Sequence, residues 1–255
     1  MNESERIANA VYFEGMTSIR SILKGFEMNV NTRKIETIYF DKNCTSSKAR
    51  ELSYLKRMSV EHFFNIEFVD RDTIDSMCVG TSHGGIIAKC TDRVFSDTLP
   101  SLLSDKKFFV MLEGIEDPFN FGYALRSLYA FGADAIILPK RNWMSAAPIV
   151  CRSSAGASEM CEIYSVDCDD AVDHFKALGA TVIATAKENS EPISDIDIKF
   201  PLLLIVGGEK RGISKKILGK VDSIARIDYG RNFNSSLSAA SAAAVLGYEI
   251  SKYLK

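Results

Sequence analysis

Three short stretches concentrate glycine, asparagine, serine and charged residues at points where apolar runs end. The first, residues 116–122, reads Glu-Asp-Pro-Phe-Asn-Phe-Gly, and Arg126 stands four residues beyond Gly122. On a helix these two residues share a face, and Arg126 lies about 100° from the centre of the apolar stripe. This position would put the guanidinium beside a ligand at a sheet edge. A lone helical arginine is more often a surface residue whose stem covers apolar neighbours.

The second stretch, residues 207–212, reads Gly-Gly-Glu-Lys-Arg-Gly and follows the apolar run Leu202–Val206. Gly207 and Gly208 would let the backbone approach a ligand closely. The spacing matches neither the dinucleotide-binding nor the P-loop pattern. The anionic Glu209 would also repel a pyrophosphate. A tight turn with a capping glutamate is the simpler structural alternative.

The third stretch begins at Ile227 and ends in Asn-Ser-Ser-Leu-Ser, residues 234–238, before an alanine-rich run. Serine and asparagine are favoured at helix N-termini because their side chains accept hydrogen bonds from free backbone N–H groups. The same serine and asparagine residues could both cap the helix and contribute to a ligand site.

The elements that would position these stretches alternate between short apolar runs and helical patterns. The runs Phe108–Leu112, Ala135–Leu138, Thr181–Thr185 and Leu202–Val206 are typical of buried parallel strands. Helices are expected at about 120–131, from about 214, and at 236–254. This order predicts a parallel sheet covered on both faces, with ligands at the carboxyl ends of its strands.

The N-terminal part predicts a separate, small α/β unit. Helices are expected at 17–26 and 46–58, and strands at 35–40, 66–69 and 85–89. A polar stretch interrupted by Pro100 suits a linker. We therefore expect two domains, 1–104 and 105–255.

Composition narrows the function classes. The net charge of −2 argues mildly against a nucleic-acid partner, but residues 20–57 hold nine basic residues against four acidic ones. Six cysteines without a C-x-x-C pair, and three histidines, indicate neither a metal site nor a disulfide framework. No signal-peptide pattern and no run of about 18 apolar residues are present, so we expect a soluble, cytoplasmic protein that is not bound to a membrane.

In this order, the three stretches resemble the motifs of TrmH-type RNA 2′-O-ribose methyltransferases of the SPOUT superfamily. The first motif, N-x-G-x-x-x-R, is met by Asn120, Gly122 and Arg126, and the second, Gly-x-Glu-x-x-Gly, by Gly207, Glu209 and Gly212. The third, Ser-Leu-Asn, reads Ser236-Leu237-Ser238 here, so its final asparagine is missing. Residues 152–157, Arg-Ser-Ser-Ala-Gly-Ala, resemble a further stretch of the family.

The resemblance implies a C-terminal parallel sheet with a deep trefoil knot, S-adenosylmethionine as cofactor, no metal, and a homodimer packed through the closing helix and the first-motif helix. It places cofactor binding and catalysis on separate residues. Those expected to bind the cofactor are Thr185, Gly207, Gly208, Ile227 and Leu237. Those expected to serve catalysis are Arg126, Asn120, Glu209, Ser236 and Ser238, with Asn120 and Glu209 holding Arg126 in its rotamer.

The N-terminal domain is similar to the ribosomal-protein-like RNA-binding domain that precedes the catalytic domain in many of these enzymes. Residues 13–15, Phe-Glu-Gly, and 83–86, His-Gly-Gly-Ile, carry this likeness. The implied reaction is methylation of a ribose 2′-hydroxyl in ribosomal or transfer RNA. The alternative is a catalytically inactive RNA-binding protein that keeps the knotted fold.

Overall fold

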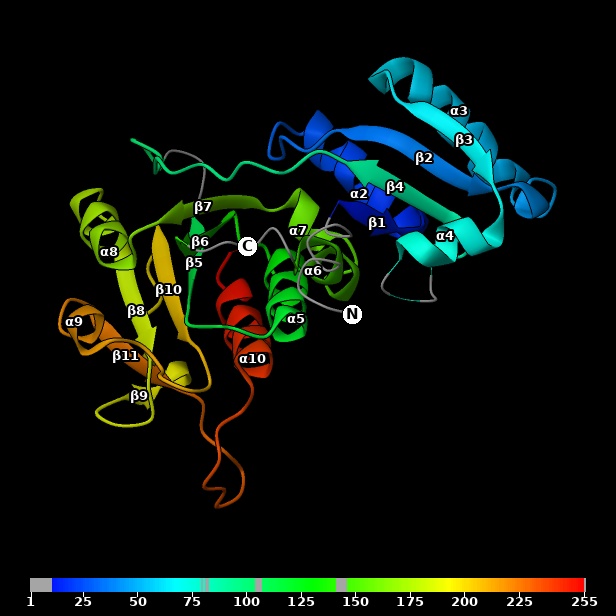
Figure 1. Ribbon diagram of the computed structural model, residues 1–255. Helices are drawn as coiled ribbons and strands as arrows, with labels where there is room; N and C mark the ends of the chain where they lie inside the picture. Colours follow the sequence, from blue (N-terminus) through cyan, green and yellow to red (C-terminus); the bar gives the residue numbers. More distant parts are fainter. Residues whose placement is uncertain (1–10, 79, 81–82, 104–106, 141–145, 255) are drawn as a thin grey trace. The chain divides into compact units, whose positions relative to one another are not determined.

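The computed structural model describes residues 11–78, 80, 83–103, 107–140 and 146–254 (Figure 1). The first ten residues and the expected domain boundary at residue 104 lie outside these ranges. By contacts, the chain divides into two compact units. Unit 1 comprises Met1–Val94 with Asn142–Met160, and unit 2 comprises Phe95–Arg141 with Cys161–Lys255.

This division differs from a single cut near residue 104 in two places. Residues 95–103 go with unit 2, because the Ser165 N–H donates a 2.8 Å hydrogen bond to the Ser96 carbonyl and the chain there lies along a strand of that unit. Residues 142–160 go with unit 1, where the buried Cys151 belongs to the apolar core.

Unit 1 is built on a four-stranded sheet of order β1-β4-β2-β3 with helices packed against it. Its core gathers apolar side chains from the strands and from α2 and α3, including Phe13, Ile38, Phe40 and Leu55. The elements are β1 (Tyr12–Glu14), α2 (Gly15–Glu27), β2 (Ile35–Asp41), α3 (Ala49–His62), β3 (Asn65–Val69), α4 (Arg71–Met77), β4 (Ile86–Cys90), α6 (Ala147–Ser153) and α7 (Ala157–Met160).

A buried ionic network ties α7 to the rest of unit 1. The Glu159 carboxylate accepts hydrogen bonds from Arg33 Nε at 3.0 Å and from Asn31 Nδ2 at 2.8 Å, and the side chains of Arg33 and Glu159 are each 4% exposed. The neighbouring Ser158 carbonyl accepts from Arg93 Nη1. Buried charges persist only when paired and hydrogen-bonded, so this network fixes the position of α7.

Unit 2 is a seven-stranded sheet of order β7-β6-β5-β10-β8-β11-β9 in which every pair of neighbours is parallel. The strands are β5 (Phe108–Glu113), β6 (Ala135–Pro139), β7 (Glu162–Val166), β8 (Thr181–Thr185), β9 (Glu191–Pro192), β10 (Leu202–Gly207) and β11 (Ser223–Arg226). The helices are α5 (Pro118–Ala130), α8 (Cys168–Ala177), α9 (Lys215–Leu218) and α10 (Ala239–Ser251).

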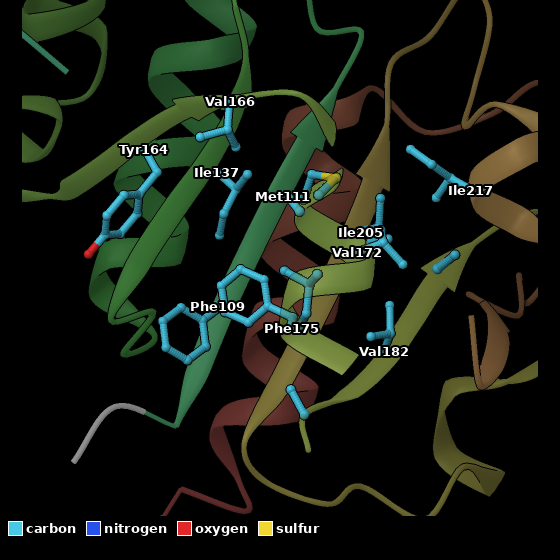
Figure 2. Packing of buried hydrophobic residues seen from close by; sticks show 14 of the residues in the cluster. Phe109, Met111, Ile137, Tyr164, Val166, Val172, Phe175, Val182, Ile205 and Ile217 are labelled. Atoms are coloured by element: carbon cyan, nitrogen blue, oxygen red, sulfur yellow. The ribbon is translucent and has the colours of Figure 1, made fainter. Parts of the chain in front are cut away.

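The alternation of side chains along β5 divides the unit into layers. Phe109 and Met111 face a cluster with Val172 and Phe175 of α8, where the rings of Phe109 and Phe175 lie 4.8 Å apart (Figure 2). Phe108, Val110 and Leu112 are equally buried and point to the opposite face. The helices α5 and α10 pack against each other, and α10 also contacts β10. Both faces of the sheet are therefore covered, and the strands accordingly consist of continuous apolar runs.

The α/β architecture with a parallel C-terminal sheet is confirmed, while the knot stays a prediction. The elements β7, α8 and β11 were not predicted from the sequence. The closing helix begins at Ala239 rather than 236, because the Ser238 hydroxyl caps it by accepting from the Ser241 N–H at 3.1 Å. Across the described residues, every helix is too short or too polar to span a lipid bilayer.

The network around Glu159 predicts a pH-dependent contribution to stability. Burial by itself raises the pKa of Glu159, but the cations of Arg33 and Arg93 and the Asn31 amide outweigh it and hold the pKa below its ordinary value of 4.5. A carboxyl whose pKa is lower in the folded state stabilises the fold above its unfolded pKa, and this stabilisation is lost as the pH falls through the folded pKa.

We expect Glu159→Gln to lower the free energy of unfolding at pH 7 by about 3 kcal/mol, since it leaves a buried guanidinium without its charge partner. Denaturant unfolding at pH 7 and below pH 4 measures the effect, and the difference from wild type should shrink at the lower pH. The exposed Glu67→Gln is the matched control. Equal stability of Glu159→Gln and wild type at pH 7 would contradict this role of the network.

Candidate active site

The second motif stretch contacts the backbone that leads into the first one, at the carboxyl ends of β5 and β10. These strands run in register, with Gly207 opposite Glu113. The Gly208 N–H donates to the Glu113 carbonyl at 2.6 Å, and a Cβ on Gly208 would lie 2.0 Å from the Gly114 oxygen. Only glycine fits so close an approach of two loops.

Through one carboxylate oxygen, Glu209 joins the second motif stretch to the first and to the helix that follows the third. Its Oε1 accepts a hydrogen bond from Asn120 Nδ2 at 2.9 Å and another from the Ala239 N–H at 3.0 Å. Asn120 belongs to the first stretch, and Ala239 opens α10, directly after the third. A carboxylate is favoured at this place because the N-terminus of a helix carries partial positive charge.

The first turn of α5 holds Asn120 in place. Asp117 caps the helix by accepting from the Asn120 N–H at 2.8 Å, and Pro118 occupies the first helical position, where a missing N–H costs nothing.

Arg126 lies two turns further along α5, is exposed, and makes no hydrogen bond or ion pair with any described residue. The expected contact of Asn120 and Glu209 with Arg126 is therefore not formed within this chain. Instead, these two residues bind each other.

The third stretch is fixed by its own contacts. The Tyr229 hydroxyl accepts from the Leu237 N–H at 3.0 Å, and Lys187 Nζ donates to the Asn234 carbonyl at 3.0 Å. Ser238 donates to Ser241 Oγ at 3.0 Å in addition to capping α10. Its hydroxyl is thereby occupied at the helix end.

A cavity of about 980 Å³ opens between these loops, and Thr185, Gly207, Gly208, Ile227 and Leu237 all line it. Glu209 and Ser236 also border it, whereas Asn120, Arg126 and Ser238 do not. All five residues expected to bind a cofactor therefore line one cavity. Of the five residues expected to serve catalysis, only Glu209 and Ser236 line it. Lys187 and Tyr229 were given no role from the sequence: Lys187 lies outside the three stretches, and Tyr229 lies in the third but is not one of the residue types that its motif specifies.

The lining of this cavity suits a nucleoside-like cofactor with a charged end. Apolar side chains such as Ile213, Ile224 and Leu246 stand beside glycine backbone and the charged side chains of Lys187 and Glu188. The volume falls in the range of roughly 300–1,000 Å³ that is usual for ligand cavities. Beneath the loop, burial raises the pKa of Glu113, although the Ser214 N–H opposes the shift by donating to its carboxylate.

The chain is similar in sequence and in fold to known proteins. Residues 107–248 match the SpoU rRNA Methylase family. The Bacillus subtilis protein YacO, named as a TrmH family tRNA/rRNA methyltransferase, is 27% identical over 224 residues, 86% of this chain and 88% of that protein. The 23S rRNA (guanosine-2′-O-)-methyltransferase RlmB of Coxiella burnetii is 30% identical over 67% of this chain and 70% of its own length.

Among solved structures, the AdoMet-bound rRNA methyltransferase from Sinorhizobium meliloti matches with a TM-score of 0.78 at 20% identity, covering 99% of this chain and 94% of that one. This likeness supports the fold of both units. Together with the family match over more than half of the chain, it confirms the resemblance seen in the motifs: the chain belongs to the SpoU rRNA methylase family of TrmH-type RNA methyltransferases.

Proposed function

We propose that this protein transfers the methyl group of S-adenosylmethionine to a ribose 2′-hydroxyl of ribosomal or transfer RNA. The observation that carries the proposal is that Glu209 bonds both the first motif stretch and the start of the helix after the third, beside a cavity lined by all five expected cofactor residues. Its direct test is to map 2′-O-methylated positions in RNA from cells that lack the gene. A position that loses its methyl group identifies the substrate.

Thr185, Gly207, Gly208, Ile227 and Leu237 would hold the cofactor, largely through main-chain groups. When bound, the cofactor supplies an electrophilic sulfonium methyl group. The protein's task is then to align the attacking ribose oxygen and to assist loss of its proton.

Arg126 is the residue we assign to that step. A guanidinium keeps its proton at any physiological pH, so Arg126 would act by orienting the 2′-hydroxyl and a neighbouring RNA phosphate rather than as a bare base. The phosphate or a water would accept the proton. The absence of any partner for Arg126 among the described residues leaves all of its donors available to RNA.

Glu209 and Asn120 receive a different role from the one expected. Their hydrogen bond links the first turn of α5 to the loop after β10, and the second bond of Glu209 fixes the start of α10. They would fix the relative positions of α5, which carries Arg126, and of the segment before α10, which carries Ser236. Ser236, exposed at the cavity rim, remains a candidate to bind the substrate phosphate.

Unit 1 is the part we assign to RNA recognition. Of the basic residues in 20–57, only Arg33 is buried, and of the acidic ones only Asp41, so eight basic and three acidic residues remain at least partly accessible. The Tyr54 ring lies 5.1 Å from the guanidinium of Arg20 and 5.8 Å from that of Arg57. Such mixtures of cations and aromatic rings bind phosphates and bases.

A homodimer is the assembly we propose, with a refinement of the expected interface. The alanines Ala239, Ala240 and Ala243 are buried within the chain, where α10 packs against α5. The apolar side chains that the two helices leave exposed are Phe119, Tyr123, Val245 and Tyr248, at 42%, 49%, 37% and 52%. These would form the contact with the second copy.

We expect Arg126→Ala to abolish methyl transfer while the Kd for S-adenosylmethionine changes by less than about threefold, since Arg126 does not line the cavity. Loss of a group that stabilises a transition state costs about a hundredfold or more. Labelled-methyl incorporation into RNA and calorimetry of cofactor binding separate the two effects. Full activity of the variant would remove Arg126 from the mechanism.

The missing asparagine of the third motif gives a second test. Both serine and asparagine cap helices well, so Ser238→Asn should leave stability unchanged. We expect wild type to be active and the variant to differ from it by at most about tenfold, or 1.4 kcal/mol in the barrier. The assay is methyl transfer to total RNA. If both forms bind the cofactor and RNA but neither transfers methyl, the protein is an inactive RNA-binding member of the family.

Tyr123→Glu should convert the dimer into a monomer at micromolar concentration, because a charge would then be buried against apolar side chains. Light scattering measures the mass directly. Leu102→Glu, in the same unit and 71% exposed, is the matched control and should leave the mass unchanged. A monomeric wild type would refute the proposed assembly.

A further inference from the structure

An aromatic pair stands on the segment between β11 and α10. The rings of Tyr229 and Phe233 lie 6.2 Å apart with 52° between their planes, and 56% of Phe233 is exposed. A single exposed ring is common at protein surfaces, but a ring that stands beside a ligand cavity is placed to contact what binds there.

The segment that carries Phe233 is anchored on both sides of it. Before it, the Tyr229 hydroxyl accepts from the Leu237 N–H, and Asp228 pairs with Arg226 at 2.7 Å. After it, the Asn234 carbonyl accepts from Lys187. These contacts hold the backbone in a conformation that keeps the Phe233 ring at the surface.

Two cavities share this aromatic pair. The smaller one, of about 460 Å³, is lined by Asp228, Tyr229, Gly230, Arg231, Phe233 and Leu237. All of these except Gly230 also border the larger cavity that we assign to the cofactor. The smaller cavity therefore adjoins the cofactor residue Leu237, and its volume suits a group of nucleoside size.

We propose that the smaller cavity is the subsite for the nucleobase of the methylated nucleotide, which stacks on Phe233. This inference rests on the proposed function. Proteins hold single, unstacked bases on aromatic rings, because every base presents a π-face. Because Leu237 lines both cavities, a base stacked on Phe233 would bring its ribose close to the cofactor cavity. Arg231 is exposed, makes no hydrogen bond or ion pair with the described residues, and can bind the adjoining phosphate.

Two substitutions at one position isolate the ring. Phe233→Trp keeps an aromatic face, whereas Phe233→Leu keeps apolar bulk without one. With total RNA from cells lacking the gene, we expect Phe233→Leu to lower kcat/KM for methyl transfer about tenfold or more, and Phe233→Trp to stay within about threefold of wild type. The Kd for S-adenosylmethionine should be the same for all three. Equal rates for the leucine variant and wild type would overturn the proposal.

A loss of cofactor affinity in Phe233→Leu that matches its loss of activity would also overturn it, since Phe233 would then contact the cofactor instead. A second readout does not depend on turnover. In saturation-transfer NMR with guanosine 5′-monophosphate and saturating S-adenosylhomocysteine, the guanine H8 proton should receive magnetisation in wild type and Phe233→Trp but not in Phe233→Leu. If wild type transfers no methyl group, the proposed function fails, and this measurement still decides whether the base-binding subsite exists.

Discussion

The site depends on one carboxylate oxygen that accepts two hydrogen bonds. Glu209 Oε1 binds the Asn120 amide and the first N–H of α10, so the first turn of α5, the loop after β10 and the start of α10 are held at one point. Neither bond is deeply buried, and each contributes modestly on its own. They matter because they fix positions. Glu209 lies on the loop after β10, and Gly208 of that loop is already packed closely against the backbone of Gly114. The cavity walls follow from this junction rather than from the sheet alone.

The parallel sheet was predictable because its central strands are continuous apolar runs. Phe108–Glu113 and Leu202–Gly207 are almost wholly buried, and short apolar runs of this kind are typical of strands covered on both faces. The strand β7 was missed because it contains Glu162, Tyr164 and Ser165, a pattern that is typical of a partly exposed edge. Likewise, β11 is only four residues long and carries polar residues at both ends. Edge strands such as β7 and very short strands such as β11 give weak periodic signals.

The candidate site was predictable as far as motifs mark it. The five residues expected to bind the cofactor line one cavity, because the carboxyl ends of neighbouring parallel strands lie at the same edge of a sheet. The expected contacts of Asn120 and Glu209 with Arg126 are not present among the described residues. The motif could not reveal this, because it specifies residue types without saying which of them bond to one another. Tyr229 and Lys187 act through a hydroxyl and a long amine whose partners lie 8 and 47 residues away. No local pattern reveals such contacts.

The two compact units do not follow the order of the chain, because the segment 142–160 belongs to unit 1 but lies between two parts of unit 2. Its helix α7 supplies the carboxylate that neutralises Arg33, although the residues on either side of the segment belong to the other unit. A gene fragment that stops at the linker would encode the sheet of unit 1 without its anionic partner. Recombination that exchanges the N-terminal half between relatives must therefore carry a compatible segment from the middle of the gene. The part of the gene that encodes Arg33 and the part that encodes Glu159 therefore have to stay compatible, although most of unit 2 is encoded between and after them.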